Sequence, residues 1–113
     1  MSASAFNCVL LSKLEKGEDQ AKLSQHLDEF IRFKLNWLRP GAMWTLRRAS
    51  LGLVDGKVCF DVCLRYTEGT AHRDGDHKKS WTKAEFESMS ISFLNVIDDV
   101  LKKIMKPIEQ EEW

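Results

Sequence analysis

Residues 5–16 carry apolar side chains at both strand and helix spacing. The alternation of Phe6 with Cys8 fits a strand, but Gly17 follows where a left-handed helix cap belongs. The second half of the segment is rich in leucine, lysine and glutamate, which favour helix. We therefore predict a short N-terminal helix. Its apolar stripe comprises Phe6, Val9, Leu10 and Leu14.

A longer helix with a broad apolar surface is predicted over residues 18–38. Glu18 and Asp19 suit the positive end of a helix dipole, and Arg39-Pro40-Gly41 ends the pattern. We expect Trp37 to belong to the core. One face of the helix holds Leu23, Leu27, Phe30, Ile31 and Leu38, and a second strip holds Phe33 and Trp37.

The sequence Val54-Asp55-Gly56-Lys57 predicts a two-residue hairpin turn, because both central residues of a type I′ turn need positive φ. The alternation after the turn then fixes the register. It pairs Leu53 with Val58, Leu51 with Phe60 and Ala49 with Val62 on the core face.

The same register predicts a second sheet face that is too apolar to be solvated, and that the N-terminal helix, a second subunit or a partner would cover. One position conflicts with it, because Arg47 would enter the core opposite Leu64. A bulge or an early strand end near Arg47 would relieve the conflict. This second face would carry Trp44, Leu46, Arg48 and Ser50 beside Cys59, Asp61, Cys63 and Arg65.

Two further elements complete the expected architecture. The polar segment 68–80 contains Asp74-Gly75 and forms either a short third strand or a loop. A last helix is predicted over residues 82–106, with Thr82 and Glu85 as a capping box and Pro107 as its limit. Trp81 and Phe86 are spaced for a hydrophobic staple, and the tail 109–113 is expected to fray.

These elements predict a single α+β domain over residues 1–113. A small antiparallel meander of two or three strands packs against two long helices and a short N-terminal helix. The length of 113 residues and the hydrophobic content of 43% suit one folded domain.

Charge and cysteine usage narrow the classes of function. Lys+Arg and Asp+Glu both number 17, so no overall field favours nucleic acid or an anionic membrane. The three cysteines Cys8, Cys59 and Cys63 form no disulfide or zinc pattern, which suggests a reducing, cytoplasmic location. We find no leader or membrane-spanning pattern.

Candidate chemistry is sparse. His72, Asp74, Asp76 and His77 are the one metal-like group, but their alternation with Arg73, Gly75 and Lys78 reads as a polar turn. No nucleophile stands in a pattern that places a base beside it, and the six glycines form no phosphate loop. We therefore predict no enzyme activity, no metal, no cofactor and no small-molecule substrate.

The segment Leu46-Arg47-Arg48-Ala49-Ser50-Leu51 resembles the substrate pattern of cyclic-AMP-dependent protein kinase. The resemblance implies Ser50 as the acceptor. Ser50 lies in the predicted hairpin opposite Asp61, where a phosphate would meet a like charge.

The sequence thus predicts a non-enzymatic protein-interaction module, such as an adaptor, a client chaperone or a small inhibitor, that self-associates as a homodimer. Its predicted interface comprises Trp44, Leu46, Arg48, Cys59, Cys63 and Arg65. Two alternatives remain. One is a small metal-dependent enzyme at the His72–His77 group. The other is an RNA- or DNA-binding domain that uses Arg48, Arg65, Arg73, Lys78 and Lys79.

Overall fold

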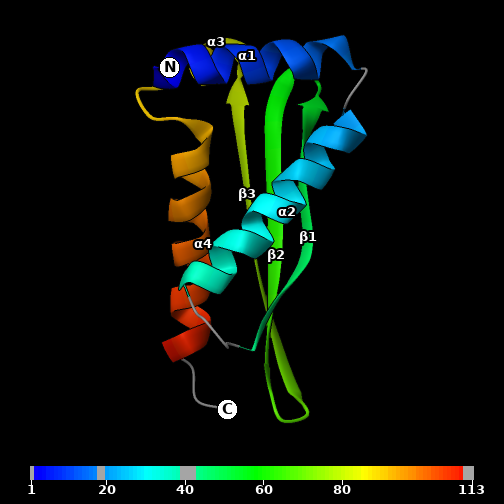
Figure 1. Ribbon diagram of the computed structural model, residues 1–113, viewed down its shortest axis with the longest axis vertical. Helices are drawn as coiled ribbons and strands as arrows, with labels where there is room; N and C mark the ends of the chain where they lie inside the picture. Colours follow the sequence, from blue (N-terminus) through cyan, green and yellow to red (C-terminus); the bar gives the residue numbers. More distant parts are fainter. Residues whose placement is uncertain (1, 18–19, 39–42, 111–113) are drawn as a thin grey trace.

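The computed structural model describes residues 2–17, 20–38 and 43–110, which form three antiparallel strands and four helices (Figure 1). The strands pair in the order β1-β2-β3, so the predicted α+β meander is confirmed. The features predicted on Glu18, Asp19, residues 39–41 and the last three residues lie outside the described residues. The elements are α1 (Ala3–Lys16), α2 (Gln20–Leu38), β1 (Trp44–Val54), β2 (Lys57–Glu68), β3 (Ala71–Thr82), α3 (Lys83–Ser88) and α4 (Phe93–Gln110).

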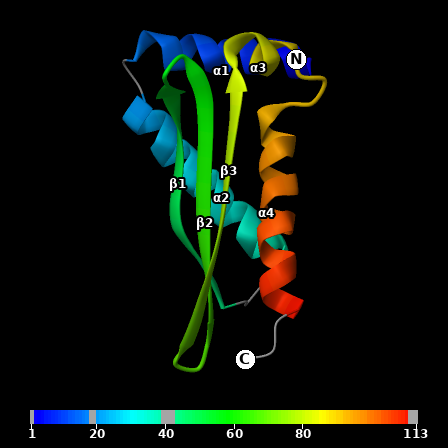
Figure 2. The same ribbon diagram turned by 180° about the vertical axis from the view of Figure 1, so that it is seen from behind.

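The helices lie on one side of the sheet. Helix α2 crosses β1 and β2 diagonally, α4 runs beside β3, and α1 lies across one end of the strands (Figure 1). Seen from behind, the strands stand in front of α2, and their opposite face carries no helix of the described chain (Figure 2). Within the described residues, none of these helices is long and apolar enough to cross a membrane.

The first hairpin has the predicted turn and register. Asp55 and Gly56 adopt φ angles of 52° and 75°, as a type I′ turn requires. The three predicted pairs around Leu53, Leu51 and Ala49 are all present. Val58, Phe60 and Val62 of the central strand are therefore buried beneath the helices.

A β-bulge at Arg47 reverses the predicted direction of the residues before it. The register shifts between Leu46 and Arg48, so Leu46 pairs with Leu64 and Trp44 pairs with Tyr66. Trp44 and Leu46 are only 8% and 6% exposed. The prediction that placed them on the second face is wrong, because the extra residue shifts the two-residue alternation by one position. The bulge itself was predicted.

The ambiguous polar segment forms a full third strand. Its turn lies at Gly69, which has a φ of 60°, and not at the Asp74-Gly75 pair inside β3. Every residue from Ala71 to Thr82 pairs with β2. The strand is polar because only one of its faces meets the helices, and α4 covers that face only in part.

The C-terminal helix is broken, contrary to the prediction of one helix over residues 82–106. The capping box of Thr82 and Glu85 starts α3 as predicted, but the helix ends at Ser88. After a short connection, Ser92 accepts from the backbone N–H of Asn95 and Val96 at the start of α4. Helix α4 also continues through Pro107, where only one N–H of the last turns is lost.

Buried Asn7 of α1 holds this break in place. Its Nδ2 donates to the carbonyl of Ile91 at 3.0 Å, and its Oδ1 accepts from the N–H of Phe93 at 2.9 Å. Asn7 is completely buried, so both bonds replace water at the break. One side chain thus joins α1 to the start of α4.

Helix α2 packs through a narrower face than predicted. Leu27, Ile31 and Leu35 are buried at intervals of four residues, whereas Phe33 and Trp37 face solvent. The expectation that Trp37 belongs to the core is wrong. Trp81 does pack against the core, and its ring stands 5.5 Å from that of Phe86, as the predicted staple requires.

Replacing Asn7 by Ala should lower the free energy of unfolding by about 2–4 kcal/mol, because Ile91 and Phe93 would each keep an unpaired, buried backbone group. Urea denaturation would measure the change. The matched control is Ser12→Ala on the exposed side of the same helix. Equal stabilities of the two variants would show that the Asn7 bonds contribute little.

Deleting Arg47 should lower the free energy of unfolding by about 3–5 kcal/mol, because the loss of the bulge turns Trp44 and Leu46 out of the core. The control Arg47→Ser keeps the number of residues and should stay within about 0.5 kcal/mol of the parent. Thermal unfolding of both variants provides the comparison. A deletion as stable as the control would mean that β1 accommodates either register.

Candidate interaction surfaces

The face of the sheet that turns away from the helices is called the outer face below. Its residues come from all three strands and form rows across the sheet. Ser50 is exposed there and pairs with Asp61, as the sequence predicted. The rows join Arg48, Cys63 and Asp76; Ser50, Asp61 and Lys78; Cys59 and Ser80; and Arg65 and Asp74.

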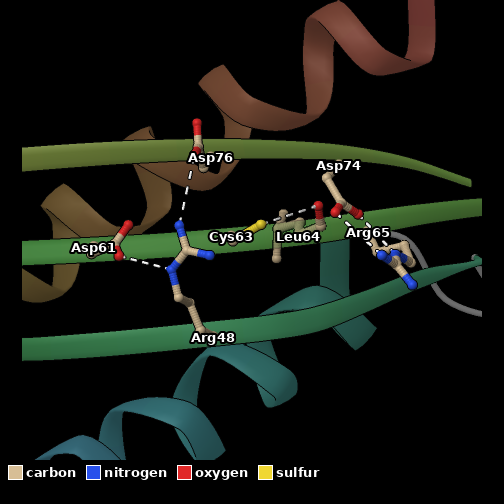
Figure 3. Close-up of polar contacts among 7 residues, drawn as sticks. All are labelled: Arg48, Asp61, Cys63, Leu64, Arg65, Asp74 and Asp76. Atoms are coloured by element: carbon tan, nitrogen blue, oxygen red, sulfur yellow. Dashed lines mark hydrogen bonds and ion pairs between the residues drawn. The ribbon is translucent and has the colours of Figure 1, made fainter.

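Arg48 lies at the centre of a charged cluster on the outer face (Figure 3). Its Nε donates to Asp61 Oδ2 at 2.8 Å, and its Nη2 lies 3.6 Å from Asp76 Oδ2. The hydrogen bond to Asp61 raises the pKa of the Arg48 guanidinium above its usual value. Arg48 of β1 is therefore engaged with two carboxylates, one on the adjacent strand β2 and one on the next strand, β3.

A second ion pair lies one row further along the same face. Arg65 donates to both carboxylate oxygens of Asp74, at 2.8 and 3.3 Å, in the two-pronged geometry that suits a guanidinium (Figure 3). The hydrogen bond from Arg65 lowers the pKa of the Asp74 carboxyl. Both side chains are largely solvated, so this pair fixes local geometry more than it adds stability.

Cys63 lies between these pairs and is buried, although it belongs to the outer face. Burial raises the pKa of its thiol, and Sγ lies 3.9 Å from the carbonyl oxygen of Leu64. A thiol in this state is a weak nucleophile. Cys59 is half-buried four residues earlier on the same strand, so neither cysteine gives the outer face an exposed apolar surface.

The predicted interface is therefore divided. Arg48, Cys59, Cys63 and Arg65 share the outer face, but Trp44 and Leu46 lie in the core. The four that remain form a polar face with compensated charge. That surface lacks the exposed apolar area that motivated the prediction.

The predicted nucleic-acid residues are divided as well. Arg48 and Arg65 are held by carboxylates, and Lys78 pairs with Asp61 across the strands. Arg73 and Lys79 project from β3 toward the opposite face of the sheet, since they pair with Tyr66 and Phe60, respectively.

The candidate metal residues also separate, because they alternate along β3. His72, Asp74 and Asp76 lie on the outer face, whereas His77 pairs with Val62 and lies on the other face. Asp74 and Asp76 are already bonded to arginines. Among the described residues, no group of three or more His, Cys, Asp or Glu side chains is arranged to hold a metal ion.

Large exposed apolar side chains gather instead on the helices. Phe33 and Trp37 of α2 are 58% and 71% exposed, and their rings meet edge to face with centroids 6.3 Å apart. Other exposed apolar residues lie in the middle of α1, at the start of α4 and at the two ends of β1. They are Val9, Ile91, Leu94, Met43 and Val54.

An apolar groove of about 320 Å³ lies where α1, α2 and α4 frame a triangle over the sheet (Figure 1). Leu51 of β1 also lines the groove, and its polar lining residues are Lys13 and His26. The apolar lining residues of the three helices are Phe6, Val9 and Leu10; Leu23, Leu27 and Phe30; and Phe93, Leu94 and Ile97.

The groove and the exposed aromatic pair share one flank of α2. Residues three, four and seven apart lie on the same side of a helix. Phe33 and Trp37 are three and seven residues beyond Phe30, which lines the groove. We call the groove together with Phe33 and Trp37 the helical face.

Periodicity alone does identify Phe33 and Trp37 as a second strip on α2. It does not show whether a neighbouring helix covers that strip. In the structure α2 contacts α4 through the ion pair of Lys34 and Asp98, with Nζ and Oδ1 3.4 Å apart. It buries Leu27, Ile31 and Leu35 and leaves the strip exposed, so the packing of α2 on distant parts of the chain decides that exposure.

Replacing Asp74 by Asn should reduce stability at neutral pH. Folding lowers the pKa of the Asp74 carboxyl. Its contribution to the free energy of unfolding is therefore fully present above the pKa that the carboxyl has in the unfolded chain, and it is lost as pH falls through the lower pKa of the folded chain. The stability difference between the parent and the variant should therefore be larger at neutral pH than at an acidic pH where the folded carboxyl is protonated. Urea midpoints at the two pH values test this.

The matched control is Asp99→Asn, since Asp99 forms no ion pair within the described part of the chain. The effect should be confined to Asp74. A pH-dependent difference of the same size for Asp99→Asn would mean that the Arg65–Asp74 pair is not its source.

Known proteins offer no match to this chain. No protein-family model, no curated protein and no solved structure matches it. Its function has to be inferred from its own surfaces.

Proposed function

We propose that the protein is a non-enzymatic protein-interaction module that binds its partner through the helical face. The observation that carries this proposal is the aromatic pair of α2, because Phe33 and Trp37 keep more than half of their surface in water. Large aromatic side chains contribute most when they are buried, and they are enriched at the centres of protein interfaces.

The groove beside the pair supports the same proposal. Its lining is almost wholly apolar, and of its polar lining residues Lys13 and His26 are the ones that could hold charge. A nucleophile needs a base within reach and a third group that orients the base. The lining offers no such set, so its composition favours binding by apolar contact over a chemical reaction.

The outer face is the weaker candidate. Arg48 and Arg65 form ion pairs with carboxylates on the same face, and Cys63 between them is buried. A partner would have to displace these ion pairs or match them at a cost in desolvation. The helical face presents no such cost, since its exposed groups gain by leaving water.

Photo-crosslinking from position 37 tests the proposal. Benzoylphenylalanine in place of Trp37 keeps an aromatic group on the helical face and reacts with a neighbour within a few ångströms. The matched control carries it in place of Ser80, which is exposed on the outer face. We expect a discrete protein adduct from position 37, its loss in the Phe33→Asp background, and none from position 80.

Adducts of equal yield from both positions would contradict the proposal, because they would reflect random collision. The absence of any adduct from position 37, in native extract and in concentrated pure protein, would also contradict it.

A further inference from the structure

The helical face carries both a projection and a cavity. Phe33 and Trp37 project from α2, and the groove begins at Phe30 of the same helix. A cavity of roughly 150 Å³ accommodates one benzene molecule. The groove of about 320 Å³ therefore has room for two aromatic side chains.

The apolar positions that α2 contributes to the helical face are symmetric about Phe30, whereas Ile31 and Leu35 lie on the core side of the helix. Leu23 and Trp37 are each seven residues from Phe30, and Leu27 and Phe33 are each three residues from it. Leu23, Leu27 and Phe30 line the groove, whereas Phe33 and Trp37 are the exposed pair. A rotation by 180° about an axis at Phe30 exchanges the two halves, as an interface between identical chains requires.

From this symmetry we propose that the occupant of the groove is a second copy of the chain, which is a specific form of the proposed function and rests on it. The two α2 helices pack antiparallel about a two-fold axis at Phe30. The partner subunit's Trp37 then meets Leu23, and the partner subunit's Phe33 meets Leu27. Each groove is filled by the aromatic pair of the other subunit.

The dimensions along the helix agree with this arrangement. At about 1.5 Å per residue, Trp37 lies roughly 10 Å from the axis on one side and Leu23 roughly 10 Å on the other. The contact therefore spans about four turns of the helix pair, and both ends of it are apolar. Each subunit contributes the same two aromatic side chains and the same groove, so the contact closes on itself and does not propagate.

The charge at the centre of this face is already compensated. Lys34 lies beside Phe30, with Nζ 5.5 Å from the centre of the ring, and it also pairs with Asp98 of α4. Approach of a second chain near Phe30 would therefore bury an existing ion pair and not an isolated ammonium group. His26 and Lys13 are the polar residues of the groove lining.

Sedimentation equilibrium of the pure protein tests the proposal. The parent should have twice the 13.1 kDa of one chain and should dissociate on dilution. Phe33→Asp and Trp37→Asp should each raise the dissociation constant at least about 30-fold, as expected for the loss of an aromatic anchor. Ser80→Asp is the matched control, since Ser80 is exposed on the outer face, and it should leave the constant unchanged.

A second measurement tests the position of the axis. In a background with Cys8→Ser and Cys59→Ser, Phe30→Cys should form a disulfide between subunits on mild oxidation, because two-fold symmetry brings the two copies of this residue together. Gln25→Cys, on an exposed part of α2 away from the groove lining, should stay reduced. Both substitutions lie at the surface or its margin, and circular dichroism would verify folding.

The outcomes separate the inference from the proposed function. A monomer at all concentrations, combined with a position-37 adduct to a different protein, would contradict the inference that a second copy fills the groove. It would still support the proposal that the protein binds a partner through the helical face. A dimer that neither aspartate variant weakens places self-association elsewhere and also overturns the inference. A monomer without any adduct from position 37 overturns both.

Discussion

The distribution of apolar surface in this protein depends on one extra residue in β1. Without the bulge at Arg47, the alternation of β1 would carry Trp44 and Leu46 to the side away from the helices. With it, both side chains enter the core, and Trp44 meets Tyr66 with ring centroids 5.0 Å apart. The outer face then needs no cover, since ion pairs and small polar groups can remain in water. The large exposed aromatic side chains, Phe33 and Trp37, are on a helix and not on the sheet.

The two faces of the molecule are stabilised by different forces. On the outer face, arginines from β1 and β2 bond carboxylates on adjacent strands, so strand pairing itself brings the opposite charges together. On the helical face, three helices surround a groove whose lining is mostly apolar. Salt weakens interactions of the first kind and leaves those of the second largely unchanged. Self-association through the helices would accordingly persist at ionic strengths that loosen the outer face.

Local signals in the sequence identified much of the fold. The turn at Asp55-Gly56, the cap at Gly17 and the capping box at Thr82 each depend on a few neighbouring residues, and each has the predicted geometry. The errors arise where distant residues decide. The break before Phe93 depends on Asn7, and the exposure of Trp37 depends on how α2 packs on other elements. The faces of Trp44 and Leu46 depend on the bulge at Arg47. The sequence indicated a conflict at Arg47, but the predicted register did not include the shift that a bulge causes in the preceding residues. The candidate site was misplaced for that last reason.

Asn7 also bears on the order in which the molecule can assemble. Its two hydrogen bonds join residues 84 and 86 positions apart, whereas the hairpins are closed by turns of two residues. Closing a longer loop costs more entropy, so the meander can form well before α1 reaches its place. During synthesis α1 emerges before α4, so Asn7 cannot make these two bonds until Phe93 has been made. Until Phe93 has left the ribosome, Phe6 and Leu10 lack their groove neighbours on α4. Their apolar side chains are then free to make non-native contacts.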